Sequence, residues 1–350
     1  MRVTERVDGY QRRHRWAGFP LAVIYKFFED QGPFLAALIT FYGFLSFFPL
    51  LLLLASVLGF LLEDNSDLKE RILDSALTQF PLIGDQLSHP QGLQGSGVAV
   101  VVGGLVALYG ALGVAQALQN AMNVAWSVPR NRRPNPVKAR LRSLLLIGTA
   151  GIAVLATTIL SALGGSAGAD GALFTGWVAL LVTFAAVVVN AAVFIVVFRL
   201  STATKLSVRD VAPGAIIAAI IWQLLQVFGT AYVANVVKNA GITYGVFAVV
   251  LGLIAWIFLA ALGVVLSVEI NVVRTKHLFP RALLTPLTDN VDLTRADRRA
   301  YTDAATAQRH KGFETVDVTF AHEGQEASAR KRPDNEVDTN SRKVVPDEEI

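Results

Sequence analysis

The residues best suited to do chemistry in this sequence are polar side chains that interrupt long apolar runs. Glu269 is the one acidic residue that we expect inside those runs, and Asn271 follows two positions later. A charged side chain within a lipid bilayer is costly unless it faces protein or water, which makes it a candidate functional group. Two interpretations stay open: a carboxylate coupled to protons or substrate, or an ion pair with a basic loop residue at the lipid headgroups.

Either interpretation requires Glu269 to face other helices instead of lipid. Its neighbours on the same helix face are apolar, so a partner must lie on another element. The expected partners lie near the same end of the helices: Arg199, Lys205, Arg209, Asn120, Asn123 and the basic run 130–142.

Amide side chains also recur at helical spacing in the second and fifth apolar runs. Steps of three and four residues place Tyr109, Gly113, Gln116, Asn120 and Asn123 on one helix face. Such a face could line a substrate path, and small and amide residues equally serve helix–helix packing. The candidates for a polar path or bundle core are Gln116, Asn120, Asn123, Asn190, Gln223, Gln226, Glu269 and Asn271.

The sequence offers few of the residue patterns on which soluble enzymes depend. The chain has no cysteine, which excludes disulfides and thiolate catalysis. Its histidines lack metal-ligand spacing, and no glycine loop followed by Lys-Ser/Thr is present. The basic run 130–142 lacks interleaved aromatic residues, so it indicates membrane orientation and not nucleic-acid binding. We therefore expect no enzyme, no cofactor and no metal site.

The elements that must position these residues are helices that cross a membrane. The chain is 53% hydrophobic and only 17% charged, and residues 143–198 and 211–268 each carry a single charge. About 20 apolar residues span a bilayer core, so each of those stretches must hold more than one helix. The sequence predicts an all-α bundle of six transmembrane helices at 34–62, 96–121, 143–164, 175–198, 211–236 and 244–270.

Lys and Arg residues are distributed unevenly between the links that join these helices. Eighteen lie in the N-terminal segment and in the links on its side, against three in the opposite links. Basic residues are retained on the cytoplasmic side, so both termini are predicted to lie inside the cell. The same residues are expected to attract anionic lipid headgroups.

Segments outside the spans complete the predicted organisation. Residues 1–33 form a basic cytoplasmic segment with an interfacial helix, and residues 34–284 form the membrane domain. In the link 63–95, Leu68, Ile72, Ala76 and Phe80 share one face, which predicts a periplasmic amphipathic helix. Residues 285–350 hold 14 acidic and 10 basic side chains with few aromatics, which is typical of a disordered cytoplasmic tail.

Several short segments resemble one known family. The sequence is similar to the YihY/virulence factor BrkB family of bacterial inner-membrane proteins in TFYGFLSFFPL at 40–50, LQNAMNVAW at 118–126, APGA at 212–215, Tyr244-Gly245, Trp256 and Glu269-Ile270-Asn271. The resemblance implies a six-helix protein of the bacterial cytoplasmic membrane. Members have carried the label ribonuclease BN, which is regarded as a misassignment.

Two positions in these segments have structural consequences. Pro49 lies in the middle of the first span, where it removes a backbone donor and should kink the helix. Ser267-Val268 stands where the family often has a Gly-Ala pair before the glutamate, which predicts looser backbone packing at the end of the sixth span.

Three functions are compatible with these observations. The first is a transporter or lipid-translocating protein that uses the polar faces of the second, fifth and sixth spans. The alternative is a non-catalytic membrane scaffold that recruits partners through its cytoplasmic loops and tail. A membrane-bound nuclease or hydrolase ranks last, because no nucleophile–base or metal constellation is recognisable. Membrane lipids are the expected partners, nucleic acid is not, and a homo-oligomer stays open.

Overall fold

The computed structural model describes residues 2–61, 97–167, 172–232, 242–288 and 291–320, and this part of the chain is helical without strands. Its long helices are α3 (Gly32–Leu61), α6 (Gly97–Ala125), α7 (Pro136–Ala167), α8 (Ala172–Ser201), α9 (Val208–Tyr232) and α10 (Ile242–Thr275). Its shorter ones are α1 (Arg2–Arg13), α2 (Arg15–Glu29), α11 (Arg295–Ala307) and a 3-10 turn, Arg130–Arg132.

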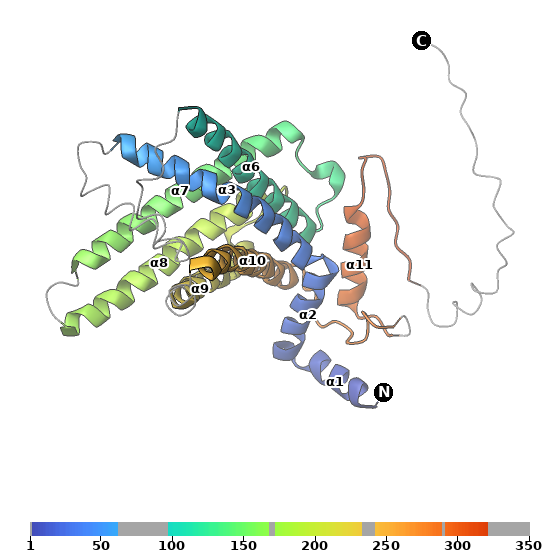
Figure 1. Cartoon of the computed structure of the whole chain (residues 1–350). Coiled ribbons are helices and arrows are strands. Elements are labelled where there is room, and N and C mark those ends of the chain that lie inside the picture. The colour runs from blue at the N-terminus through green and yellow to red at the C-terminus, as the bar shows by residue number, and fades with distance from the viewer. Residues whose placement is uncertain (1, 62–96, 168–171, 233–241, 289–290, 321–350) are drawn as a thin grey trace, which may run out of the picture.

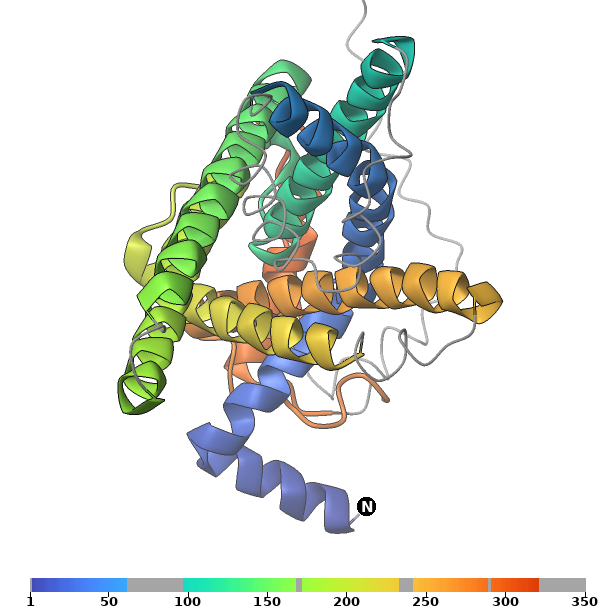
Figure 2. The same ribbon diagram turned by 60° about the vertical axis from the view of Figure 1, so that its left-hand side comes forward.

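The long helices form a closed ring (Figures 1 and 2). Each of α3, α6, α7, α8 and α9 packs against the next long helix in the chain, and α10 closes the ring against α3. Helix α2 also packs against α10, so the segment before the first long helix reaches the last one. That contact brings residues from the two ends of the ring together.

Several of these helices are apolar enough to cross a membrane. By length and composition, four stretches qualify among the described residues: Val101–Ala125, Thr183–Ser201, Val208–Gly229 and Phe247–Thr275. Helices α3 and α7 form at the other two predicted positions. The all-helical membrane architecture is therefore confirmed, whereas six spans and the inside location of both termini remain predictions.

The outer surface of the ring matches a lipid environment. Large apolar side chains are exposed along the long helices, including Leu105 on α6, Phe184 on α8, Phe228 on α9 and Leu251 on α10. A soluble protein rarely exposes so many of them together, whereas a lipid-facing surface requires them.

Two glycines allow the closest approaches between helices. A Cβ on Gly110 of α6 would lie 2.8 Å from Ser46 Cα of α3. A Cβ on Gly214 of α9 would lie 2.1 Å from the Ser267 carbonyl oxygen of α10. Small residues at such contacts are what membrane helices use to pack. The prediction of looser packing around Ser267-Val268 is therefore wrong, because Gly214 on the facing helix supplies the missing space.

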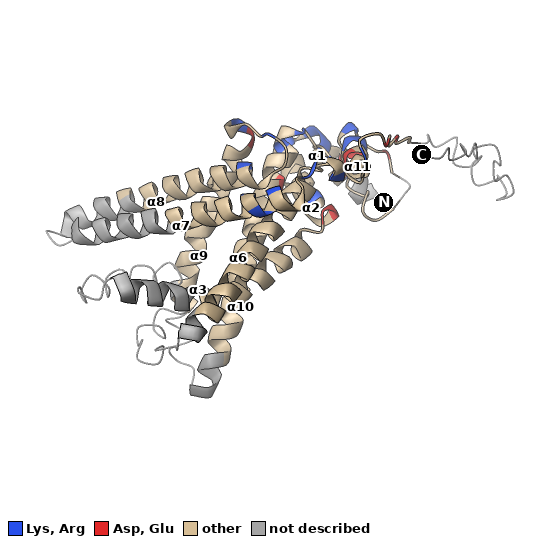
Figure 3. Cartoon of the chain, turned by 90° about the horizontal axis from the view of Figure 1, so that it is seen from above, with Lys and Arg blue, Asp and Glu red and all other residues tan. Residues whose placement is uncertain are grey.

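Charged residues gather at one end of the ring, where α1, α2 and α11 lie (Figure 3). Helix α11 overturns part of one prediction, because residues 295–307 of the expected disordered tail form a helix with Ala296, Asp297 and Ala300 buried. The expectation rested on average composition, which misses a short helix that packs through small residues and one buried carboxylate. Residues 321–350, and the predicted amphipathic helix at Leu68–Phe80, lie outside the described residues.

Candidate functional site

Glu269 lies in the last turns of α10 and is fully buried. Neither of its carboxylate oxygens accepts a hydrogen bond from an N–H or hydroxyl group of the described residues. The charged groups that act on it are instead Lys26, Asp30 and Glu29. The prediction that Glu269 faces the bundle is thus correct, but its neighbours belong to α2 and the α2–α3 turn and not to the expected loops.

Helix α2 delivers Lys26 from its buried face. Gly18, Ala22, Val23 and Phe27 are buried on the same side, so the amphipathic helix carries its lysine inward with its small and apolar residues. Lys26 is only 3% exposed and its Nζ donates to Asp30 Oδ2, one helical turn further on.

The α2–α3 turn delivers Asp30. Its N–H donates to the Lys26 carbonyl oxygen, which closes the last turn of α2. Gln31 then takes a positive φ of 56°, and a Cβ on Gly32 would overlap the Phe27 ring at 2.4 Å. The tight reversal holds the Asp30 carboxylate at the junction of α2, α3 and α10.

The Asp30 and Glu269 carboxyl groups are close neighbours inside the protein, and each acts on the charge of the other. Two buried carboxylates that lie close together repel each other unless one of them carries a proton. With one proton, the pair has a single negative charge, and the Lys26 ammonium balances it. We call Lys26, Asp30 and Glu269 the buried triad.

The surroundings of the buried triad are apolar. Phe27, Leu35, Ala36, Ala121 and Val265 form a buried cluster drawn from α2, α3, α6 and α10.

Burial raises the pKa of the Asp30 carboxyl, although Lys26 acts against the shift. Burial alone would lower the pKa of Lys26, but the carboxylates of Glu269 and Asp30 outweigh it and raise that pKa. The triad therefore favours a bound proton and a charged lysine.

A second charged cluster lies next to the first, centred on Arg281. Its guanidinium donates Nη2 to Glu29 Oε1 at 2.5 Å and Nη1 to Glu29 Oε2 at 3.1 Å. On the other side Nε donates to Asp297 Oδ1 at 2.5 Å, and both of those side chains are fully buried. Burial alone would lower the pKa of Arg281, but the hydrogen bonds and charges of its two carboxylate partners raise it. We call Arg281, Glu29 and Asp297 the arginine clamp.

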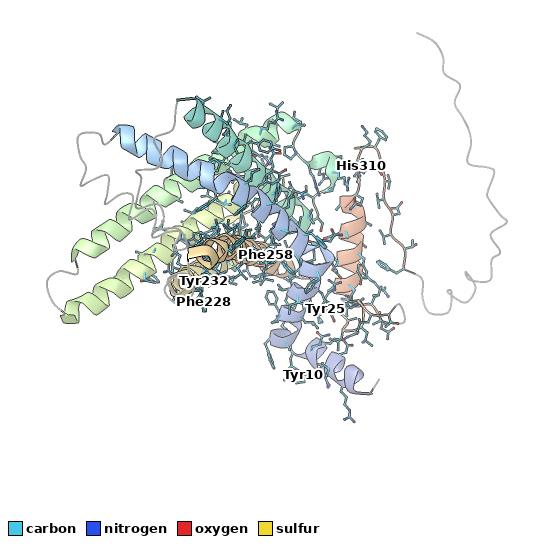
Figure 4. All side chains as sticks on the ribbon, in the orientation of Figure 1. Tyr10, Tyr25, Phe228, Tyr232, Phe258 and His310 are labelled. Carbon is cyan, nitrogen blue, oxygen red and sulfur yellow. The ribbon has the colours of Figure 1, made fainter. Side chains whose placement is uncertain are left out.

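The arginine clamp fastens α11 and the segment before it onto α1 and α2. Asp297 also accepts from the Ala282 N–H at 3.0 Å, and it forms a capping box with Thr294 at the start of α11. Asp8 of α1 accepts from the Leu283 N–H at 2.8 Å. Tyr25 of α2, labelled in Figure 4, donates to the Leu283 carbonyl oxygen. Because Glu29 and Asp30 are adjacent, the clamp and the buried triad share one helix end.

The structure gives two predicted polar residues a packing role. The Asn123 carboxamide oxygen accepts from the Ala203 N–H at 2.9 Å, which joins α6 to the α8–α9 link. Asn271 accepts from the Gly214 N–H at 2.7 Å and donates to the Val211 carbonyl oxygen at 3.0 Å, which joins α10 to α9. The two Asn271 bonds hold α9 and α10 at the close contact that Gly214 permits.

The other predicted residues are spread over the molecule. Asn120 is half-buried and accepts from Arg133 at 3.4 Å, whereas Gln116 is exposed on α6. The buried amide of α6 is Gln119, which donates to Ser143 Oγ of α7 at 2.9 Å. The side chains of Asn190, Gln223 and Gln226 are half-buried. Pro49 is also half-buried, and helix α3 continues through it. The shared polar path and the kink at Pro49 remain predictions.

Sequence reasoning missed most of the two clusters. A lysine that follows the apolar run Phe19–Tyr25 and precedes Glu29-Asp30 was a signal for the triad. The spacing of Thr294 and Asp297 matches a capping box and could have revealed α11. No local pattern indicates that Arg281 is buried, because its partners lie 252 and 16 residues away.

Comparisons with known proteins agree with the helical membrane architecture. The family model described as "Virulence factor BrkB" matches residues 23–290. The ribonuclease-like protein YfkH of Bacillus subtilis (strain 168) is 25% identical over 254 residues, which cover 71% of this chain and 91% of that protein. A UPF0761 membrane protein of Psychrobacter sp. (strain PRwf-1) is 26% identical over 295 residues, which cover 80% of this chain but only 53% of that protein. No solved structure matches.

Proposed function

Since this chain belongs to the virulence factor BrkB family, we propose that it is a proton-linked transport protein of the bacterial inner membrane. In this proposal the six long helices all span the bilayer, the charged end faces the cytoplasm, and the cargo is a solute or a lipid. The buried triad is the group that binds and releases the proton.

The single observation that carries this proposal is the nearness of the Asp30 carboxyl to the buried Glu269 carboxyl, which has no hydrogen-bond partner among the described residues. A structural ion pair would need one carboxylate for one lysine, whereas the triad holds two carboxylates for Lys26. The surplus carboxylate is neutral only with a proton and charged without it. Since α10 and the α2–α3 turn carry the two carboxyls, loss of the proton places like charges between two elements and favours their separation.

The scaffold alternative rests on a different observation, the ordered charged end. Helix α11 and the segment 308–320 offer a surface to cytoplasmic partners, and a scaffold would not need a titrating triad. A ribonuclease, to which the Bacillus relative is likened by its name, needs a nucleophile–base pair or a metal. Among the described residues no group of three or more His, Cys, Asp or Glu could hold a metal ion.

A distance measurement separates transport from scaffolding without knowledge of the cargo. Because the chain has no cysteine, spin labels can be placed on Val101→Cys of α6 and Phe184→Cys of α8, both exposed. Double electron–electron resonance on the protein in liposomes should show a distance distribution that changes between acidic and alkaline pH. In the double variant Asp30→Asn with Glu269→Gln, the distribution of label-to-label distances should be the same at all pH values.

The matched control is Asp317→Asn, an exposed carboxylate, which should leave the pH response intact. A distribution that is identical at every pH in the unmodified chain would contradict the transport proposal and favour the scaffold.

A further inference from the structure

The exposed face of α2 is apolar and aromatic and continues directly into α3. On α2 the exposed positions Trp16, Pro20, Ile24 and Phe28 follow each other in steps of four, which places them on one helix face. Trp16 is 69% exposed and Phe28 64%. The same stripe continues on α3 through the exposed residues Phe34, Leu38 and Phe41.

The direction of α2 suits a membrane surface better than a membrane span. Figure 1 shows α2 running across the long direction of α3, at the charged end of the ring. A helix with one apolar face that crosses the span direction at the end of a bundle lies in the plane of the lipid interface. Its opposite face is already occupied, because Ala22, Val23, Lys26 and Phe27 are buried in the protein.

The junction of α1 and α2 adds charge and interfacial aromatic rings. The rings of Tyr10, His14 and Trp16 lie together, with centroids 4.1 Å apart for Tyr10–His14 and 6.0 Å for Tyr10–Trp16. Tyr10 lies on α1, outside the ring of long helices (Figure 4). Arg13 and Arg15 flank this cluster, and both are exposed. Trp and Tyr favour the headgroup level of a bilayer, and arginine attracts anionic headgroups.

We propose that the exposed stripe of α2 and the Tyr10–His14–Trp16 cluster form an in-plane anchor that binds the anionic lipid surface through Arg13 and Arg15. Lipid is favoured over a protein partner because the stripe resumes in exposed apolar residues of α3, just beyond the exposed Glu29 and Gln31 at the α2–α3 turn. The anchor also fixes the helix that carries Lys26 and that ends next to Asp30. It does not depend on the transport proposal, since a scaffold would need the same anchor.

Site-directed spin labelling tests this assignment on the full chain in liposomes that contain phosphatidylglycerol. The spin relaxation of a nitroxide at Ile24→Cys should be accelerated by oxygen, which dissolves in lipid. A water-soluble nickel chelate should have little effect on the same label. A label at Arg295→Cys, exposed at the start of α11, should show the opposite response. A label at Ile24→Cys that the nickel chelate reaches as readily as the one at Arg295→Cys would overturn the proposal.

Two further outcomes separate lipid from other occupants. Arg13→Gln with Arg15→Gln should shift a label at Trp16→Cys toward the nickel chelate in phosphatidylglycerol liposomes, and should cause no shift in neutral phosphatidylcholine. A label at Ile24→Cys that neither reagent reaches, together with a short label-to-label distance, would show that a second copy of the chain covers the stripe. That result would overturn the proposal.

Discussion

The charged end and the apolar ring of this protein are held together by different forces. At the charged end, long side chains connect segments far apart in sequence, as when Arg281 binds Glu29 across 252 residues. In the ring, helices approach closely where one of them has a glycine and therefore no Cβ. Gly214 against the Ser267 carbonyl oxygen is an example. The ring therefore tolerates little added volume, whereas the charged end tolerates little loss of charge.

This contrast also explains where a proton site can form. A carboxylate deep in the ring would have no charged neighbour, and a carboxylate in the outer charged layer would be solvated. The buried triad lies between the two, where α2 brings charge against the apolar end of α10.

The largest effect is expected at the arginine clamp. Arg281→Ala leaves Asp297 buried without its cation, and removal of one partner from a buried pair costs about 3–5 kcal/mol. The thermal unfolding of the detergent-solubilised protein should show this loss. Arg295→Ala, an exposed arginine of α11, is the control and should change stability little. Equal stability of both variants would mean that the clamp does not hold α11.

A smaller loss is expected from added volume in the ring. Gly214→Ala places a methyl group 2.1 Å from the Ser267 carbonyl oxygen, so α9 and α10 must move apart. Overpacking of this kind costs about 1–3 kcal/mol. Gly148→Ala on α7 is the matched control, because nothing lies within 4 Å of its added Cβ. If the two substitutions destabilise equally, helix propensity and not the close contact sets the cost.

The capping box of α11 should matter less again. Thr294→Ala removes the side chain that accepts from the Asp297 N–H, and loss of such a cap typically costs about 1 kcal/mol. Limited proteolysis should then cut α11 faster, while the rest of the chain unfolds at a nearly unchanged temperature. Thr302→Ala in the middle of the same helix should not accelerate cleavage.

The smallest expected signal is a change in how stability depends on pH. Because the pKa of Asp30 is raised above its ordinary value of 3.8, the folded state binds more protons than the unfolded state above that pH. Stability should therefore fall as pH rises from the ordinary Asp range through the raised pKa. Burial is the main cause of the raised pKa of Asp30; Glu29 adds to it, whereas Lys26 and Glu269 act against it.

Asp30→Asn tests the sign of this dependence, since an amide keeps the shape and can donate to Glu269 without a titrating proton. Its unfolding temperature should vary less with pH over the same range. A variant with an unchanged pH profile would show that Asp30 does not titrate differently in the two states.

The ring was predictable from sequence and the charged end was not, for a physical reason. Apolar runs are local, so all six long helices form where the runs at 34–62 to 244–270 place them. The partners of Glu269 depend on the contact between α2 and α10. These helices are far apart in the sequence, so no local pattern predicts that contact. The count of basic residues includes Lys26 and Arg281 only as charges outside the spans, yet both are buried beside carboxylates, Asp30 for Lys26 and Glu29 for Arg281.

Infrared spectroscopy is the direct test of whether Asp30 and Glu269 share one proton. At neutral pH the protein in liposomes should show the carbonyl stretch of a protonated carboxylic acid. Both Asp30→Asn and Glu269→Gln should lose this band, because the remaining carboxylate can then pair with Lys26 alone. A spectrum without the band in the unmodified protein, or a band that persists in both variants, would show that Asp30 and Glu269 do not share a proton.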